Sequence, residues 1–186
     1  PFEFKELLRQ CYHMGNRSLV LVMVTGFIIG LVLTLQSRPT LIEFGAESWM
    51  PNMVGISIVR ELGPVITALV CAGRIASGLG AELGSMRVTE QIDAMEVSGT
   101  NPFKYLVVTR ILAITLMLPL LVIIGDAVAL YGSALVENFK GNVSFQLYFN
   151  RVFDALDYRD LIHATIKSFF LIFHYKFYVY CCIFLL

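Results

Sequence analysis

The sequence predicts an all-α integral membrane protein, and both its composition and its apolar runs support that fold class. Apolar residues make up 57% of the chain and charged residues 15%, with a mean hydropathy of +0.73. Soluble domains average about 45–50% apolar and about 25% charged residues. Several apolar runs are long enough to cross the roughly 30 Å of membrane hydrocarbon as helices. We therefore expect no soluble enzyme.

Charge and cysteine usage exclude several other classes of protein. Lys plus Arg and Asp plus Glu number 14 each, so no net charge favours nucleic acid as a partner. The four cysteines lack CxxC spacing and the three histidines lie far apart, so we expect neither a disulfide framework nor a metal site. The chain begins with Pro1, which suggests a fragment or a processed form. Its first apolar run lacks the small residues of a signal-peptide cleavage site.

The first membrane span is predicted at 18–37, twenty residues without charge, after an interfacial segment at 1–17. Gly26 and Gly30 have the GxxxG spacing that allows close helix packing, although glycines at this spacing also occur in helices that face lipid. The residues at 38–47 are rich in loop signals and predict a loop.

The second span is predicted at 49–73 and carries two adjacent ionisable residues, Arg60 and Glu61. Ionisable side chains at this depth are rare unless they face a cavity or a partner, so the pair is a candidate functional site. Sequence neighbours point about 100° apart on a helix, so a direct ion pair between the two does not follow. Pro64 removes a backbone hydrogen bond and predicts a bend nearby.

The segment 78–98 is predicted to be an amphipathic helix outside the membrane, because acidic residues gather on one side and apolar residues on another. Gly99, followed by Asn101-Pro102, predicts its end. Small residues recur every four positions before and within this segment, and they predict a strip for close helix packing: Ala72, Ala76, Gly80 and Gly84.

The remaining residues predict a third span at 105–136, an extramembrane loop at 137–160 and a fourth span at 161–186. The third span is interrupted by Asp126 and should bend at Pro119. A second small-residue strip follows in the same span, at Gly125, Ala129 and Ser133.

Basic residues near the ends of the spans predict the orientation of the chain. The N-terminal segment and the 74–110 segment hold seven Lys and Arg residues, whereas the 38–50 and 137–157 segments hold three. Basic residues are enriched on the cytoplasmic side of membrane proteins. We therefore expect the N-terminus and the 78–98 helix to be cytoplasmic.

No catalytic motif accompanies these spans. The sequence has no G-x-x-x-x-G-K-[ST], no G-x-S-x-G and no H-E-x-x-H, so a nucleotide cradle and the common hydrolase sites lack their minimum parts. The glycines at 78–84 miss the dinucleotide-binding spacing and are assigned to helix packing. A transporter driven by a separate ATPase needs a helix that leaves the membrane and docks on that ATPase. The 81–97 stretch suits this role, although it would equally suit an interfacial helix that joins two spans.

The centre of the sequence resembles one known family. The runs Arg60-Glu61-Leu62-Gly63-Pro64-Val65, Ala72-Gly73-Arg74 and AELGSMRVTEQIDAM at 81–95 closely resemble the MlaE (YrbE) family of ABC transporter permeases. The similarity extends from about residue 18 to about residue 170 and is most specific over 57–110.

The resemblance implies a homodimeric permease in the inner (cytoplasmic) membrane of a Gram-negative-type bacterium, with a lipid cavity between the two copies. Its implied activity is to move phospholipid between the inner and outer membranes. The implied partners are a cytoplasmic MlaF-like ATPase, an MlaD-like MCE protein and, in some systems, an MlaB-like STAS protein. ATP and magnesium would bind to the ATPase, so no cofactor is expected in this chain and no catalytic residue either.

Two sets of site residues follow from the resemblance. Arg60, Glu61 and Pro64 match a charged region of the second span, which we place at the lipid cavity or at a partner contact. The 81–97 stretch matches the coupling helix of the family, and its expected contacts with the ATPase are Glu82, Met86, Arg87, Glu90, Gln91, Asp93, Met95 and Glu96.

The sequence departs from the family at its end, and two other functions stay open. The family has a fifth span that is missing here, and beyond Phe170 the tail does not resemble the family, so we expect a truncated or frame-shifted gene end. One rival function is an ion-coupled secondary transporter or channel that uses Arg60, Glu61 and Asp126 as a relay. The other is a non-transporting assembly subunit.

Overall fold

A computed structural model describes the backbone of residues 4–99 and 109–185. It describes the side chains of residues 7–99 and 110–171, apart from Leu79, Leu83, Glu96, and Ile111. Every regular element in these ranges is a helix, so the all-α fold class is confirmed. In chain order they are α1 (Phe4–Glu43), the 3₁₀-helix η1 (Glu47–Trp49), α2 (Met50–Ser57), the π-helix η2 (Ile58–Leu62), α3 (Gly63–Val88), α4 (Gln91–Val97), α5 (Thr109–Gly141), α6 (Phe145–Ala155) and α7 (Tyr158–Leu185).

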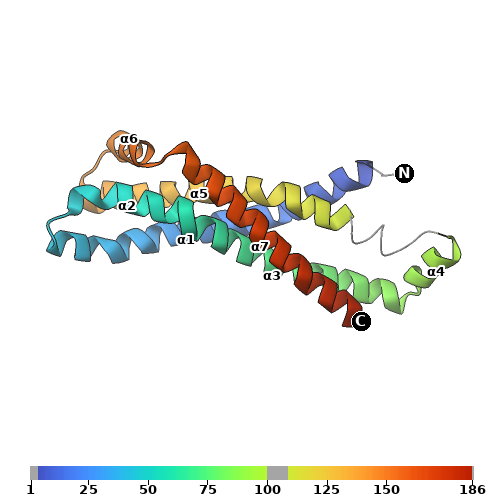
Figure 1. Cartoon of the computed structure of the whole chain (residues 1–186). Coiled ribbons are helices and arrows are strands. Elements are labelled where there is room, and N and C mark those ends of the chain that lie inside the picture. Colours follow the sequence, from blue (N-terminus) through green and yellow to red (C-terminus); the bar gives the residue numbers. More distant parts are fainter. Residues whose placement is uncertain (1–3, 100–108, 186) are drawn as a thin grey trace.

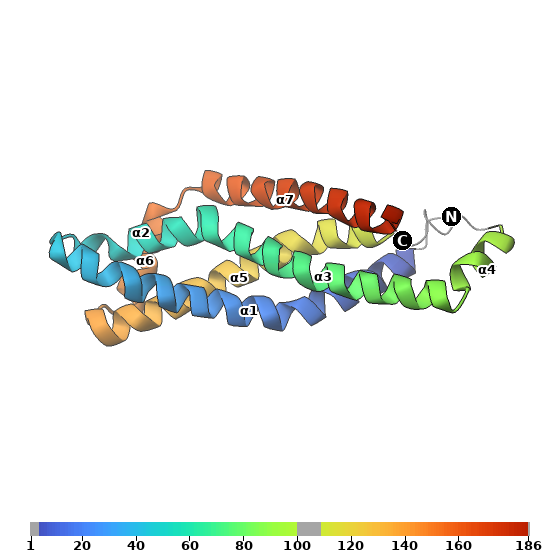
Figure 2. The same ribbon diagram turned by 90° about the horizontal axis from the view of Figure 1, so that it is seen from below.

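The helices form one elongated bundle (Figures 1 and 2). α1 and α5 pack most extensively against each other and run in the same direction. The rod formed by α2, η2 and α3 returns beside them, and α7 lies along α3 in the same direction as α3. We call the end with η1 and α6 the η1 end, and the end with α4 and the start of α1 the α4 end.

Small residues allow α1 and α5 to pack backbone to backbone. A Cβ added to Gly26 would lie 2.8 Å from the carbonyl oxygen of Gly125, and one added to Gly30 would overlap the carbonyl oxygen of Ala129. Helices approach this closely only where the facing residues are small. The structure therefore decides between the two interpretations of the GxxxG step: its glycines pack against the small-residue strip of α5.

Three segments of the described chain are long and apolar enough to cross a membrane: Leu7–Glu43, Glu47–Val88 and Leu112–Gly141. They contain the predicted first and second spans and most of the third, whose residues 105–108 lie outside the described residues. The 40 residues of α1 make a helix of about 60 Å, so it extends well beyond the hydrocarbon. The predicted fourth span corresponds to α7. It stays a prediction because the side chains from residue 172 onward are not described.

The predicted loop at 38–47 is mostly helix. α1 continues to Glu43 despite an internal proline, and the chain turns at Gly45, whose φ of +64° favours glycine. Arg38 donates a hydrogen bond of 2.8 Å to Glu137 of α5, 99 residues away. This long-range contact supports the last turns of α1, and tertiary contacts of this kind override local loop signals.

The segment at 137–160 is also not an irregular loop. α5 continues to Gly141, and α6 begins after Ser144, whose hydroxyl accepts a hydrogen bond from the backbone N–H of Leu147. Tyr148 and Val152 are both buried and lie four residues apart on one face of α6. Aromatic residues among polar ones suggested a loop, whereas the buried positions follow the helical period.

The predicted helix at 78–98 is divided, and its first half is not separate from the second span. α3 runs without interruption to Val88, and α4 begins at Gln91. The break lies at Glu90, whose φ of +56° is left-handed. Glycines in a helix cost about 1 kcal/mol each relative to alanine but do not end it, which is why the glycines near residue 80 did not mark a boundary.

Candidate functional site

The candidate site begins with an irregularity in the second span, at the π-helix η2. The N–H of Gly63 donates to the carbonyl of Ile58, five residues earlier, and Pro64 has no N–H to donate to the carbonyl of Arg60. That carbonyl instead accepts a hydrogen bond of 3.0 Å from Nζ of Lys167 on α7. Single turns of π-helix inside α-helices often occur at functional sites. The π-helix contains Arg60 and Glu61, so the backbone irregularity and the charged pair indicate the same candidate site.

Arg60 forms a two-pronged ion pair with Asp160 of α7. Nε of Arg60 lies 2.7 Å from Oδ1, and Nη2 donates to Oδ2 at 3.0 Å. Asp160 is buried, whereas the Arg60 side chain is 48% exposed. The pair uses two of the five N–H donors of the guanidinium, and the exposed part of Arg60 can still reach an anion.

Glu61 pairs with the same helix. Its Oε1 lies 3.7 Å from Nζ of Lys167, and both side chains are largely exposed. The adjacent charges of the second span therefore each face an opposite charge on α7, and not each other. We call Arg60, Glu61, Asp160 and Lys167 the charged cluster.

The sequence analysis did not assign Asp160 and Lys167 to the site. Their signal was present, because they lie seven residues apart and hence on one face of a helix. They also carry the charges opposite to Arg60 and Glu61 in matching order. Only the parallel packing of α7 on α3 turns that pattern into contacts.

Asp126 has different neighbours from those of the charged cluster. It is 8% exposed, and its Oδ1 has no hydrogen-bond partner among the described residues. The oxygen lines a cavity of about 10 Å³ between α1, α3 and α5, about the space of one water molecule. A Cβ added to Gly63 would overlap this carboxylate, so only glycine fits there. The three residues of the suggested ion relay thus face different neighbours.

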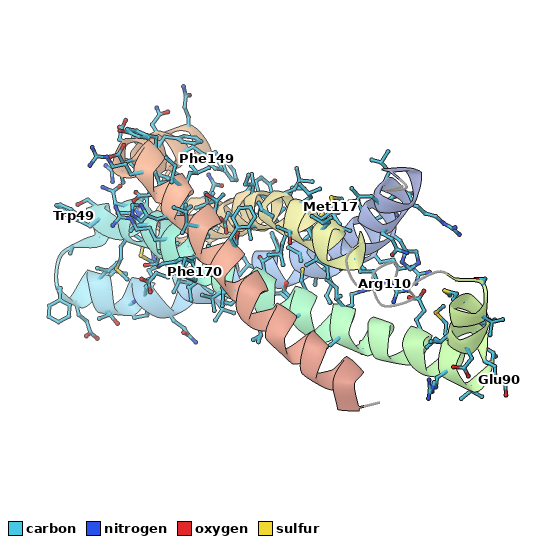
Figure 3. The ribbon with its side chains drawn as sticks, turned by 45° about the vertical axis from the view of Figure 1, so that its right-hand side comes forward. Trp49, Glu90, Arg110, Met117, Phe149 and Phe170 are labelled. Carbon is cyan, nitrogen blue, oxygen red and sulfur yellow. The ribbon has the colours of Figure 1, made fainter. Side chains whose placement is uncertain are left out.

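The second half of α3 projects from the bundle together with α4, at the α4 end (Figures 1 and 3). We call residues 78–98 the α3–α4 segment. Figure 3 shows Glu90 at its tip, far from Trp49 at the η1 end. Added Cβ atoms on Gly80 and Gly84 would meet nothing within 4 Å. At these two glycines, the small-residue strip of α3 therefore packs against no described part of this chain. The packing role of this strip stays a prediction.

The residues expected to contact an ATPase differ in their surroundings. Glu82 forms an ion pair with Arg110 at the start of α5, with 2.6 Å between Oε1 and Nη2. Arg87 and Asp93 form an exposed ion pair, with 3.6 Å between Nη1 and Oδ1. Glu90 and Gln91 are exposed. Met86 and Met95 are half-buried, and the Glu96 side chain lies outside the described residues. The structure thus brings exposed charges together at the tip of this segment.

The described residues of these sites form ion pairs and line a small cavity at Asp126. No three His, Cys, Asp or Glu side chains among the described residues lie close enough to hold a metal ion. The Arg60 side chain and several charged side chains at the tip of the α3–α4 segment are exposed.

Comparison with known proteins places these features in a family. The family model described as "Permease MlaE" matches residues 7–182. A "Probable ABC transporter permease protein" of Rickettsia typhi is 38% identical over 168 residues, which cover 90% of this chain and 65% of the relative. The "Intermembrane phospholipid transport system permease protein MlaE" of Haemophilus influenzae is 39% identical over 74% of this chain and 53% of its own length.

A chloroplast protein of Arabidopsis thaliana, "TRIGALACTOSYLDIACYLGLYCEROL 1", is 33% identical over 89% of this chain and 47% of the relative. This chain thus spans about two thirds or less of the length of these relatives. The match of the family model covers the three candidate spans, the charged cluster and the α3–α4 segment. The chain is therefore a multi-pass membrane protein that belongs to the MlaE permease family.

Proposed function

We propose that this protein is the permease subunit of an ABC transporter that moves phospholipid between the inner and outer membranes of a Gram-negative-type bacterium. A separate MlaF-like ATPase, which binds ATP and magnesium, drives it through the 78–98 segment. The observation that carries the proposal is the projection of the α3–α4 segment beyond the bundle, at the end where α1 begins. That is the end predicted to be cytoplasmic from the distribution of basic residues.

The continuity of α3 supports a lever mechanism. The helix is 26 residues long and joins the turn at Glu90 to Gly63, next to the charged cluster. A push on the tip is carried along one hydrogen-bonded helix of about 39 Å into the membrane. The π-helix before Gly63 is the place where the rod can change its bend, because its backbone hydrogen bonds are already irregular.

The charged cluster supports the lipid part of the proposal. Arg60 keeps exposed N–H donors in the second span, and guanidinium groups bind phosphate well because their donors form a rigid fork. Two copies of the chain would place two such groups around a shared cavity. The relative from Haemophilus influenzae is named as part of a phospholipid transport system, which agrees with a phosphate-bearing substrate. An MlaD-like MCE protein and an MlaB-like STAS protein complete the proposed assembly.

The proposal is tested by reconstituting the protein with its ATPase and following a labelled phospholipid. Glu90→Lys with Asp93→Lys reverses two exposed charges at the tip and should abolish both ATPase capture and ATP-driven lipid transfer. Glu43→Lys with Asp154→Lys reverses two exposed charges at the η1 end and should change neither. Undiminished ATPase capture by the tip variant would contradict the proposed docking.

One observation favours the ion-coupled alternative: Oδ1 of buried Asp126 has no hydrogen-bond partner among the described residues. Intramembrane carboxylates often mark proton paths. This alternative requires transport that follows a proton gradient, ignores ATP and stops in Asp126→Asn. An assembly subunit would show no transfer under either condition.

A further inference from the structure

A basic cleft lies between the first half of α1 and the second half of α3, away from the charged cluster. Its volume is about 820 Å³, within the range of ligand sites. Three arginines and one histidine line it, together with one carboxylate, one glutamine, two serines and four small or apolar residues. The basic residues are Arg9, His13, Arg17 and Arg74.

The basic residues of α1 form a row on one face of the helix. Arg9, His13 and Arg17 are spaced by four residues, so their side chains lie above one another. Arg74 faces them across the cleft from α3. The three arginines thus place positive charge on both sides of the cleft, and an anion between them would reduce their mutual repulsion.

The one acidic residue in the cleft pairs with neither Arg17 nor Arg74. Glu82 pairs with Arg110 at 2.6 Å, which Figure 3 shows at the start of α5. Arg110 is 5% exposed, and its Nη1 has no partner among the described residues. Arg17 and Arg74 form no ion pair with another described residue. Arg17 and Arg74 therefore bring two positive charges to the cleft that no described carboxylate pairs with.

The position of the two arginines along the chain indicates which anion fits. Arg17 directly precedes the uncharged run 18–37, and Arg74 directly follows the apolar part of the second span. Both therefore lie where helices leave the hydrocarbon, at the depth of the lipid phosphates. Basic pockets between membrane helices bind anionic headgroups at this depth. Met14 and Ile75 line the same cleft and offer apolar contact to the glycerol and the upper acyl chains.

We propose that the cleft formed by Arg9, His13 and Arg17 of α1 and Arg74 of α3 binds a phosphate group, supplied by an anionic phospholipid of the membrane leaflet at the α4 end. This inference goes beyond the proposed function, because the binding needs neither ATP nor an ATPase. The same chemistry would accept inorganic phosphate from solution, so the test separates the two sources.

The test uses the protein, purified in its membrane complex, in nanodiscs of phosphatidylcholine with or without phosphatidylglycerol, in the absence of ATP. Native mass spectrometry counts the phosphatidylglycerol molecules retained, and a parallel series adds inorganic phosphate. The test variant is Arg17→Gln with Arg74→Gln. The matched control is Lys140→Gln with Arg159→Gln, which removes two exposed charges elsewhere.

Wild type and control should retain phosphatidylglycerol, and the test variant should bind it at least about tenfold more weakly, because each arginine near lipid phosphates contributes strongly to binding. Binding of inorganic phosphate without retention of phosphatidylglycerol would confirm an anion site in the cleft, but would assign it to a soluble anion and not to a phospholipid. Equal retention by the test variant and wild type, or equal loss in test variant and control, would overturn the proposal. So would retention of neither probe by the wild type. A folded test variant is verified by its unchanged ATPase capture.

Discussion

The two ends of the bundle differ in how firmly they are held. At the η1 end, α2, α5 and α6 share one buried cluster that includes Met50, Val54, Tyr148 and Val152. Polar contacts reinforce it, such as the 2.6 Å hydrogen bond between the hydroxyls of Ser133 and Tyr148. At the α4 end, the glycines of α3 from residue 73 onward meet nothing within 4 Å. Regions with few buried contacts open at lower free-energy cost. Apolar packing thus anchors the rod at the η1 end, whereas at the α4 end the ion pair of Glu82 with Arg110 links it to α5.

The largest effect is expected from the buried ion pair at the anchored end. Glu137 is 1% exposed and Arg38 only 12%. Arg38→Met leaves that carboxylate without its partner, which should lower the free energy of unfolding by about 3 kcal/mol. Thermal unfolding in detergent checks this. Arg87→Met, which breaks an exposed pair at the α4 end, should cost less than about 0.5 kcal/mol. Equal losses in both variants would remove the contrast between the ends.

The next largest effect is expected at Gly30, which packs against α5, and we compare it with Gly80 in the projecting half of α3. Gly30→Ala forces a methyl group against the carbonyl of Ala129 and should destabilise the α1–α5 packing by about 1–3 kcal/mol. Gly80→Ala enters open space and should stabilise α3 by about 0.5–1 kcal/mol, because alanine favours the helix. The same unfolding measurement applies to both. A loss of complex assembly in Gly80→Ala would show that a partner covers the small-residue strip.

The smallest effect is expected between the two ends, at the charged cluster. Lys167→Met removes the hydrogen bond to the Arg60 carbonyl as well as the pair with Glu61, and should cost about 1 kcal/mol. Glu61→Gln removes only the exposed pair and should cost less than about 0.5 kcal/mol. If Glu61→Gln proved as harmful as Lys167→Met, the ion pair rather than the carbonyl contact would support the π-helix.

Much of the fold could be predicted because the relevant signals are local. Length and hydropathy placed the spans at 18–37 and 49–73 inside helices that the structure contains. The left-handed Gly99, with φ of +77°, lies where the stop signal was predicted. Element boundaries were less accurate. α1 extends past its predicted end because the contact of Arg38 with Glu137 supports its last turns. α3 extends past its predicted end because glycines weaken a helix without ending it.

By itself, the sequence determined the fold class, the family and the ionisable residues in the second span, because hydropathy, periodicity and motif are properties of short stretches. Only the tertiary structure decided that Arg60 pairs with Asp160 and that Asp126 faces a separate cavity. It also decided that Arg17 and Arg74 share a cleft. The reason is physical. Pairing depends on which helix faces lie together, and that is set by close packing between residues about a hundred positions apart, such as Gly30 and Ala129.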